Sequence, residues 1–121
     1  MKISNWQSGR WAEFLARNWL RCKGYRIIMC NYKTHRGSSA GEIDFIASKG
    51  KTLVFVEVKK RSSLANAAEA ILPKQQQRII RGAEAFLQKN PHFINYDMRF
   101  DAVLISFPLR IRHLKNAWTI N

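Results

Sequence analysis

The sequence predicts a mixed α/β fold in which helices pack against a central β-sheet, in the order α-β-β-β-α-β-β. Two stretches, 8–23 and 73–90, repeat apolar residues at helical spacing. Runs rich in β-branched and aromatic residues lie between and after them, at 25–32, 41–48, 52–59, 99–107 and 109–120. With 121 residues and no linker or internal repeat, the chain is expected to form a single domain over 1–121.

Both expected helices carry signals at their ends. In the first, Ser8 can cap the N-terminus and Gly24 follows as a stop. In the second, Pro73 suits the first position and Pro91 follows the last turn. The expected apolar stripes are Trp11, Phe14, Leu15, Trp19 and Leu20 in the first helix and Ile79, Ile80, Ala83, Phe86 and Leu87 in the second. We also expect a short helical turn over 66–72 and an edge strand at 109–120.

The strand expected at 52–59 carries charges inside an apolar run. Residues 53–56 are all apolar, which is typical of a strand buried on both faces, yet Glu57 and Lys59 follow directly. Because side chains alternate along a strand, these two share one face with Phe55, and Val54, Val56 and Val58 take the other. Buried charges cost several kcal/mol unless they are paired or bind a metal.

The charge balance points to a polyanionic partner. Twenty-one Lys and Arg against eight Asp and Glu give a formal net charge of +13, which favours nucleic acid. No apolar run approaches the ~18 residues of a membrane helix, and the first residues lack the apolar core of a signal peptide. We therefore expect a cytoplasmic protein without a membrane partner. Cys22 and Cys30 are expected to be reduced core residues.

A hairpin between 41–48 and 52–59 brings acidic residues together in two of its three simplest registers. On the first strand, alternation places Glu42, Asp44 and Ile46 on one face and Ile43, Phe45 and Ala47 on the other. A turn at 50–51 puts Asp44 opposite Glu57, whereas a turn at 49–50 puts Glu42 there with Asp44 on the diagonal. A slip by one residue separates the acids onto opposite faces.

Converging carboxylates indicate a metal site. Two close carboxylates repel unless one is protonated or a cation lies between them. Lys59 can supply part of that charge, and Mg²⁺ (or Mn²⁺), which takes carboxylate, water and phosphate oxygens, can supply the rest. Such an ion assists phosphodiester hydrolysis. The structural alternative is a buried ion pair between Lys59 and one acid.

The pattern resembles a known nuclease signature. Asp44, followed by a hairpin and Glu57-Val58-Lys59, resembles the acid…Glu-x-Lys motif of the PD-(D/E)XK nuclease superfamily. More closely, the chain resembles the bacterial YraN family, also called UPF0102. The segments that carry this resemblance are GEIDFIA at 41–47 and LVFVEVKKR at 53–61, together with GRWAE at 9–13, KQQQR at 74–78 and RFDAV at 99–103.

This resemblance implies a restriction-endonuclease-like core, similar to archaeal Holliday junction resolvases. It implies that Asp44, Glu57 and the backbone carbonyl of Val58 are metal ligands and that Lys59 is the catalytic lysine. It also implies that the first helix contributes an acid, which matches Glu13. From spacing alone, Glu13 is a solvated helix residue paired with Arg10 or Arg17. Two further acids have open roles: Glu42 is either a metal ligand or a partner of Lys59, and Asp101 either belongs to the site or forms an ion pair with Arg99 or another strand neighbour.

Two functional hypotheses follow. The first is a metal-dependent endonuclease that hydrolyses DNA, at branched structures such as Holliday junctions, with phosphates held by Arg36, Arg61, Lys74 and Arg78. The second is a catalytically inactive nucleic-acid-binding protein with the same fold. His35, in a basic loop, is a catalytic base, a phosphate contact or simply a solvated residue. A homodimer is expected under either hypothesis if the substrate has two-fold symmetry.

Overall fold

A computed structural model describes residues 5–34, 41–61, 71–106 and 110–119, with side chains from Arg10 onward. The elements are α1 (Asn5–Cys22), β1 (Arg26–Lys33), β2 (Glu42–Lys49), β3 (Thr52–Lys60), α2 (Pro73–Lys89), a short 3-10 helix η2 (Pro91–Phe93), β4 (Asp97–Ser106) and β5 (Arg110–Trp118). This order confirms the predicted α-β-β-β-α-β-β arrangement, which is consistent with a nuclease-like core.

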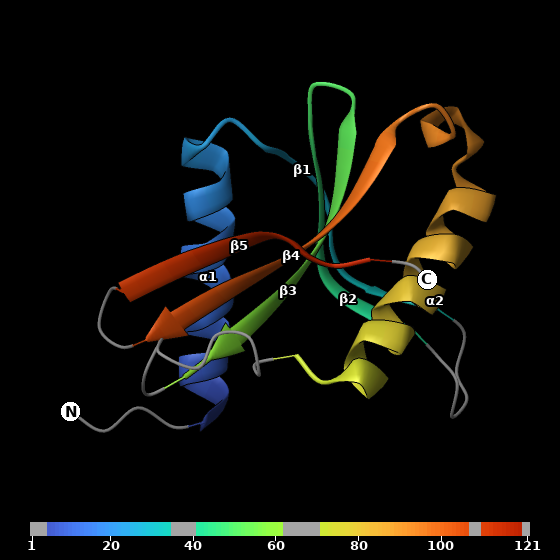
Figure 1. The fold of residues 1–121 in the computed structure, drawn as a ribbon. Coiled ribbons are helices and arrows are strands. Elements are labelled where there is room, and N and C mark those ends of the chain that lie inside the picture. The colour runs from blue at the N-terminus through green and yellow to red at the C-terminus, as the bar shows by residue number, and fades with distance from the viewer. Residues whose placement is uncertain (1–4, 35–40, 62–70, 107–109, 120–121) are drawn as a thin grey trace.

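The described strands form one mixed sheet between two helices (Figure 1). The strand order is β1-β2-β3-β4-β5, in which β3 and β4 run parallel and the other neighbours run antiparallel. One core cluster joins the sheet to α2 through Ile46, Phe55 and Phe86. A second joins the other face to α1 through Leu20, Val54 and Val56. The strand β3, in the middle of the sheet, is therefore covered on both faces, as its apolar run predicts.

Helix α1 differs from its prediction in its start and in its buried face. It begins at Asn5, so the prediction of Ser8 as its cap is wrong. Its most buried line is Ala12, Ala16 and Leu20, because small side chains let the helix lie close to the sheet. The remaining predicted aromatic and leucine positions border this line half-buried, but Phe14 is 54% exposed and lies near the guanidinium of Arg17.

Helix α2 follows its prediction closely. Pro73 is its first residue and Lys89 its last, and four of the five predicted stripe residues are buried while Leu87 is half-buried. The backbone N–H of Leu72 donates to Oε1 of Gln75, which satisfies one group at the start of the helix. The helical turn expected over 66–72 lies mostly outside the described residues.

The β2–β3 hairpin adopts one of the two registers that bring the acids together. Lys49 pairs with Thr52 and Phe45 pairs with Val56, so the turn is at 50–51, where Gly50 has a positive φ of 60°. The next pair in this register is Asp44 with Glu57. The turn at 49–50 and the one-residue slip are excluded.

β2 leaves β3 at Asp44. The β2–β3 ladder starts at Phe45, whereas Glu42 and Ile43, which precede Asp44, pair only with β1. The prediction that Ile43 shares a face with Phe45 and Ala47 is wrong: those two pack in the α1 cluster, but Ile43 packs in the α2 cluster. Simple alternation fails because the strand turns where it separates from its neighbour.

A glycine pair fixes the distance between β2 and α2. A Cβ placed on Gly41 would lie 2.4 Å from the backbone nitrogen of Gly82 and 2.7 Å from the carbonyl oxygen of Arg78. Only glycine permits such backbone contact. This close approach holds the first half of α2 beside the start of β2.

The remaining predictions concern the edge strand, the cysteines and the surface. β5 is an edge strand, as predicted. Cys22 and Cys30 are free but exposed, so their prediction as core residues is wrong.

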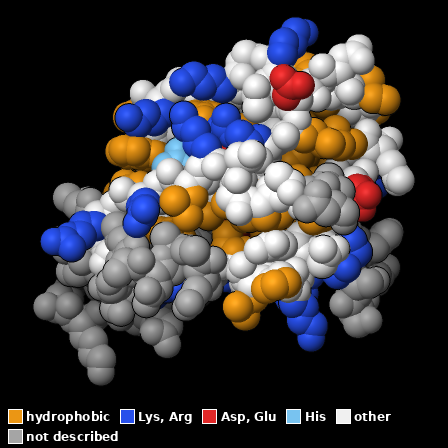
Figure 2. Space-filling model, viewed as in Figure 1, with side chains coloured by type: hydrophobic (Ala, Val, Ile, Leu, Met, Phe, Trp, Pro, Cys, Tyr) orange, Lys and Arg blue, Asp and Glu red, His pale blue; other side chains and the backbone are white. Residues whose placement is uncertain are grey.

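Figure 2 shows Lys and Arg side chains across one face with few acidic side chains between them. Within the described part of the chain, no helix is long and apolar enough to cross a membrane.

Candidate active site

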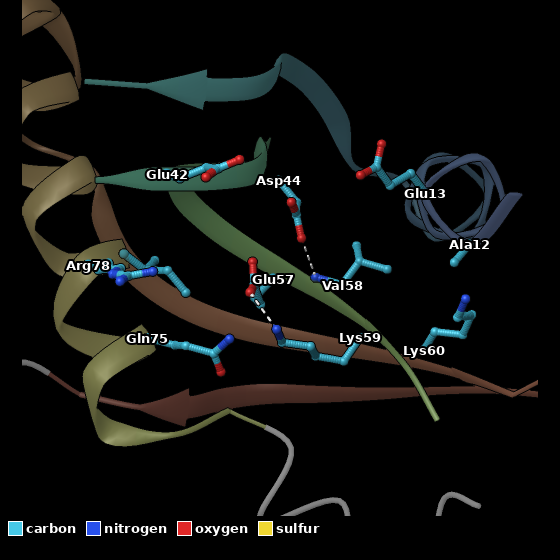
Figure 3. A pocket seen from close by; sticks show the side chains of 11 residues that line it. Ala12, Glu13, Glu42, Asp44, Glu57, Val58, Lys59, Lys60, Gln75 and Arg78 are labelled. Carbon is cyan, nitrogen blue, oxygen red and sulfur yellow. Dashed lines mark hydrogen bonds and ion pairs between the residues drawn. The ribbon is translucent and has the colours of Figure 1, made fainter. Parts of the chain in front are cut away.

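A cavity of about 350 Å³ opens between α1 and α2 at the end of β3 (Figure 3). We call it the acidic cavity. Four of the eight acidic residues of the chain are found in its lining, which is unexpected for a protein of net charge +13. The described lining residues are Ala12, Glu13, Glu42, Asp44, Glu57, Val58, Lys59, Lys60, Gln75, Arg78 and Ile79.

Where β2 separates from β3, the side chain of Asp44 accepts a hydrogen bond that the backbone of β3 would otherwise donate to β2. Its Oδ2 accepts a hydrogen bond from the backbone N–H of Val58 at 2.8 Å. A strand residue directs its N–H and C=O to the same edge. The Val58 carbonyl therefore faces the gap beside Asp44, where the resemblance to nucleases places a third metal ligand.

Glu57 lies against Asp44 and Lys59. Its side chain is only 13% exposed, and its carboxylate lies 3.4 Å from Nζ of Lys59. Burial, the charge of Asp44 and a hydrogen bond with Asp44 raise the pKa of Glu57 to about 8, although Lys59 lowers it. The positive charge of Lys59 alone therefore does not cancel the effect of burial and of Asp44 on the pKa of Glu57. At neutral pH the Asp44–Glu57 pair retains a proton unless further positive charge arrives.

Glu13 projects into the same cavity from α1. It is half-buried, and burial together with the charges of Asp44 and Glu42 raises its pKa, while Arg10 and Arg17 lower it. The two arginines act on Glu13, as its spacing predicts, and Glu13 also lines the acidic cavity; its role as a site acid stays a prediction. Glu42 lines the cavity as well, but the recorded ion-pair partner of Lys59 is Glu57.

Two polar residues of α2 form the opposite wall. Gln75 and Arg78 share a helix face at i, i+3 spacing, and both line the acidic cavity. Because Oε1 of Gln75 accepts from Leu72, its amide NH₂ is left to face Lys59 (Figure 3). Gln75 was not predicted as a site residue, although its i, i+3 spacing from Arg78 was a usable signal. Nor was Lys60, which follows the motif.

Of the described residues predicted to contact phosphate, only Arg78 lines the acidic cavity. Arg78 lines the acidic cavity, whereas Lys74 is exposed on the first turn of α2 outside the lining. Arg61 is exposed just beyond β3, where its backbone N–H donates to Ile105 and its guanidinium donates to the Lys60 carbonyl. Arg36 and His35 lie outside the described residues.

Asp101 is not part of the acidic cavity. It faces the α1 side of the sheet, whereas its neighbour in sequence, Ala102, pairs with Glu57 and faces α2. Asp101 is fully buried and accepts two hydrogen bonds at 2.9 Å from Arg99. It also lies 2.7 Å from Nε2 of His113 and accepts from the N–H of Asn116. Of the two roles left open for it, the structure supports the ion pair.

Comparison with known proteins identifies the family. A family model described as "Uncharacterised protein family UPF0102" matches residues 12–105. The chain belongs to this family. A UPF0102 protein of Paramagnetospirillum magneticum is 47% identical over 114 residues, covering 93% of this chain and 88% of the relative. One of Nitrobacter winogradskyi is 44% identical over 119 residues, covering 98% of this chain and 97% of the relative.

The UPF0102 match contains the whole acidic cavity. It runs from Ala12 at one wall to Ile105 near the end of β4, and includes Glu13, Asp44 and Glu57. Strand β5 lies beyond it.

The donor set of the acidic cavity suits a hard divalent cation. Carboxylate oxygens and a backbone carbonyl are the ligands that Mg²⁺ takes, usually one or two carboxylates completed by water and phosphate. Asp44, Glu57 and the Val58 carbonyl provide such a set. Across the described ranges, no three His, Cys, Asp or Glu side chains are grouped closely enough to hold a metal by themselves. A bound ion would therefore need water and substrate oxygens to complete its coordination.

Proposed function

We propose that this UPF0102 protein is a metal-dependent endonuclease that hydrolyses DNA phosphodiester bonds, with Mg²⁺ or Mn²⁺ as its cofactor. The observation that carries the proposal is the contact between Asp44 and Glu57 beside Lys59, in a protein of net charge +13. Such a carboxylate pair is stable in the ionised form only with a cation between its members. The positive surface attracts a polyanionic substrate.

In the proposed mechanism, Asp44 and Glu57 act as the ligands and Lys59 acts on the attacking water. When bound, a divalent cation supplies positive charge for the phosphoryl oxygens and acidity for a water molecule. The ammonium of Lys59, held 3.4 Å from Glu57, orients that water or offsets the charge that develops on the phosphate. Arg78 and Lys60 line the acidic cavity and hold the flanking phosphates.

We further propose that the DNA substrate is branched, as in a four-way junction. It rests on the resemblance to junction-resolving nucleases. A substrate with two-fold symmetry requires two active sites, so a homodimer is part of this finer proposal.

The test is incubation of labelled linear duplex, single-stranded and four-way DNA with the protein in Mg²⁺ or Mn²⁺. We expect cleavage by the parent protein and a loss of ~10²–10⁴-fold in rate for Asp44→Asn and for Lys59→Met. Asp97→Asn is the matched control, because Asp97 is an exposed carboxylate at the start of β4, outside the acidic cavity. Cleavage that persists unchanged in Asp44→Asn and Lys59→Met contradicts the proposal.

The second candidate is a nucleic-acid-binding protein without catalysis. One observation favours it: Lys59 already forms an ion pair with Glu57. It predicts salt-sensitive DNA binding without cleavage. It also predicts tighter binding by Asp44→Asn, because removing a negative charge reduces repulsion of phosphate. Binding that requires Mg²⁺ argues against it.

A further inference from the structure

A second hollow, of about 420 Å³, lies between the first turn of α2 and strands β4 and β5. We call it the α2–β5 hollow. Five of its nine described lining residues are apolar, and two others, Arg112 and Lys115, are exposed cations. The described residues that line it are Ile71, Gln76, Ala102, Arg112, His113, Leu114, Lys115, Ala117 and Trp118.

The lining of the α2–β5 hollow is positively charged. Arg112 and Lys115 are both exposed, and no Asp or Glu is present among the described lining residues. This is the reverse of the acidic cavity, where four carboxylates meet. A hollow that combines cations with apolar surface suits a ligand with both an anionic group and a flat apolar body.

A bulge in β5 shapes this hollow, and the buried Asp101 holds the bulge. Ala102 pairs with Leu114, but Phe100 pairs with Trp118, so β5 has two extra residues between these pairs. Within the bulge, Asn116 has a positive φ of 55°, and its N–H donates to Oδ1 of Asp101 at 2.9 Å. The flanking residues Lys115 and Ala117 line the α2–β5 hollow as a result.

The α2–β5 hollow adjoins the acidic cavity. Glu57 of the acidic cavity pairs with Ala102, and Ala102 pairs with Leu114, both of which line the hollow. Neighbouring strands lie ~4.8 Å apart, so the two sites are separated by one to two strand spacings. On α2, Gln75 lines the acidic cavity and Gln76 lines the hollow. Since a stacked nucleic-acid strand advances ~3.4 Å per nucleotide, the separation is within about three nucleotides.

We propose that the α2–β5 hollow binds an unpaired nucleotide of the DNA substrate, within about three nucleotides of the phosphate that is cut. Its base lies on the apolar floor formed with Leu114 and Trp118, and its phosphate lies against Arg112 and Lys115. A base in a duplex is paired and stacked, so it cannot enter a concave apolar site without leaving the helix. The hollow thus selects DNA in which a single strand emerges near the cleavage point. This inference rests on the proposed nuclease function.

The experiment compares binding of a blunt duplex with binding of the same duplex carrying a short single-stranded thymidine tail. Fluorescence anisotropy in Ca²⁺ or EDTA measures affinity, and a parallel assay in Mg²⁺ measures cleavage by the parent protein. We expect the parent to prefer the tailed duplex by about tenfold, the scale of one stacked base. We expect the double variant Arg112→Gln/Lys115→Gln to lose this preference but to keep its thermal unfolding midpoint, because both side chains are exposed.

Two further variants make the test specific. Ala117→Glu, which places an acid at the exposed edge of the hollow, is expected to remove the preference by a different chemistry. Arg26→Gln is the matched control, because Arg26 is an exposed strand cation that pairs with Ser48 near the hairpin turn. It is expected to keep the preference. In tailed DNA, 2-aminopurine placed within three nucleotides of the junction is expected to change its fluorescence on binding to the parent and to Arg26→Gln, but not on binding to Arg112→Gln/Lys115→Gln or Ala117→Glu.

The outcomes separate this inference from the proposed function. If the parent cleaves DNA but binds tailed and blunt duplexes equally, the assignment of the hollow is wrong and the nuclease proposal stands. The same conclusion follows if the Arg112→Gln/Lys115→Gln and Ala117→Glu variants keep the preference, or if Arg26→Gln loses it equally. If the parent neither binds nor cleaves DNA, the proposed function fails and the inference fails with it.

Discussion

Glu57 is a half-buried carboxylate that lies against a second carboxylate, and this environment is the strongest sign of chemistry at the residue scale. Burial and Asp44 raise its pKa to about 8 despite the nearby Lys59. The folded protein therefore holds a proton on Glu57 that the unfolded chain releases above its ordinary pKa of 4.5. Binding of a divalent cation would displace that proton, which couples metal affinity to pH.

The sign of this shift gives the first prediction for stability. A raised pKa in the folded state means that the free energy of unfolding falls as pH rises from 4.5 to about 8. Glu57→Gln removes this dependence. In EDTA, we expect the variant to be more stable than the parent by up to about 4 kcal/mol at pH 8 and nearly equal at pH 4.5, because each pKa unit between 4.5 and about 8 corresponds to ~1.4 kcal/mol.

Urea unfolding of both proteins at several pH values measures this difference. Glu84→Gln is the control, because Glu84 is an exposed acid on α2 outside the acidic cavity, and it is expected to follow the parent. A parent protein whose stability relative to Glu57→Gln stays constant between pH 4.5 and 8 contradicts the electrostatic account of the pair.

At the scale of secondary-structure elements, two local irregularities place the functional surfaces. The first is the divergence of β2 from β3 at Asp44, which opens the ladder beside Val58. The second is the bulge of β5, held by Asp101. Neither follows from hydrophobic alternation, since alternation describes regular strands. The pairing register of the hairpin, in contrast, was among the three considered from the sequence, and it is one of the two that bring the acids together.

The buried network of Asp101 gives a second prediction. Although burial by itself raises the pKa of Asp101, hydrogen bonds from His113, Arg99 and the Asn116 amide lower it overall. Removal of this charge leaves the buried groups around it uncompensated. We expect Asp101→Asn to lower the free energy of unfolding by about 3 kcal/mol at pH 7.

Denaturant unfolding measures this loss of stability. The control is Asp97→Asn, because Asp97 is an exposed carboxylate on the same strand. Its free energy of unfolding is expected to lie within about 0.5 kcal/mol of that of the parent. A lowered pKa means that the stabilisation is lost as pH falls through the folded-state value, below 3.8. The gap between Asp101→Asn and the parent should therefore narrow in acid. An equal loss of stability at neutral and acidic pH contradicts the network account.

The contact between β2 and α2 gives a third prediction. A Cβ on Gly41 would meet the backbone of Gly82 at 2.4 Å, which no side-chain movement relieves. We expect Gly41→Ala to destabilise the fold by ~2–3 kcal/mol. A Cβ on Gly82 meets only the side chain of Ile43, at 3.0 Å, and alanine favours the helix, so Gly82→Ala should change stability by no more than about 1 kcal/mol. Thermal or urea unfolding of the pair measures both, and equal effects contradict the account.

At the scale of the whole molecule, the parts predictable from sequence were those set by local pattern. The order of elements, the α2 stripe, the central position of β3 and the convergence of Asp44 with Glu57 all follow from periodicity and turn residues. Three features depend on contacts distant in sequence and were not predictable: the Ala12–Ala16–Leu20 face of α1, the place of Ile43 in the α2 cluster, and the cysteine exposure. Gln75 was not predicted because its amide is uncharged, whereas the neighbouring Lys74 and Arg78 were predicted from their charge.

The central claim is that the acidic cavity takes up a divalent cation through Asp44 and Glu57. Titration of the purified protein with Mn²⁺, followed by isothermal titration calorimetry or by the electron paramagnetic resonance signal of free Mn²⁺, tests it without DNA or activity. The account predicts saturable binding by the parent that strengthens from pH 6 to 8, and a loss of at least about tenfold in affinity for Asp44→Asn and Glu57→Gln. Asp97→Asn should bind as the parent does. Mn²⁺ binding of equal affinity in the parent, Asp44→Asn and Glu57→Gln would contradict the account.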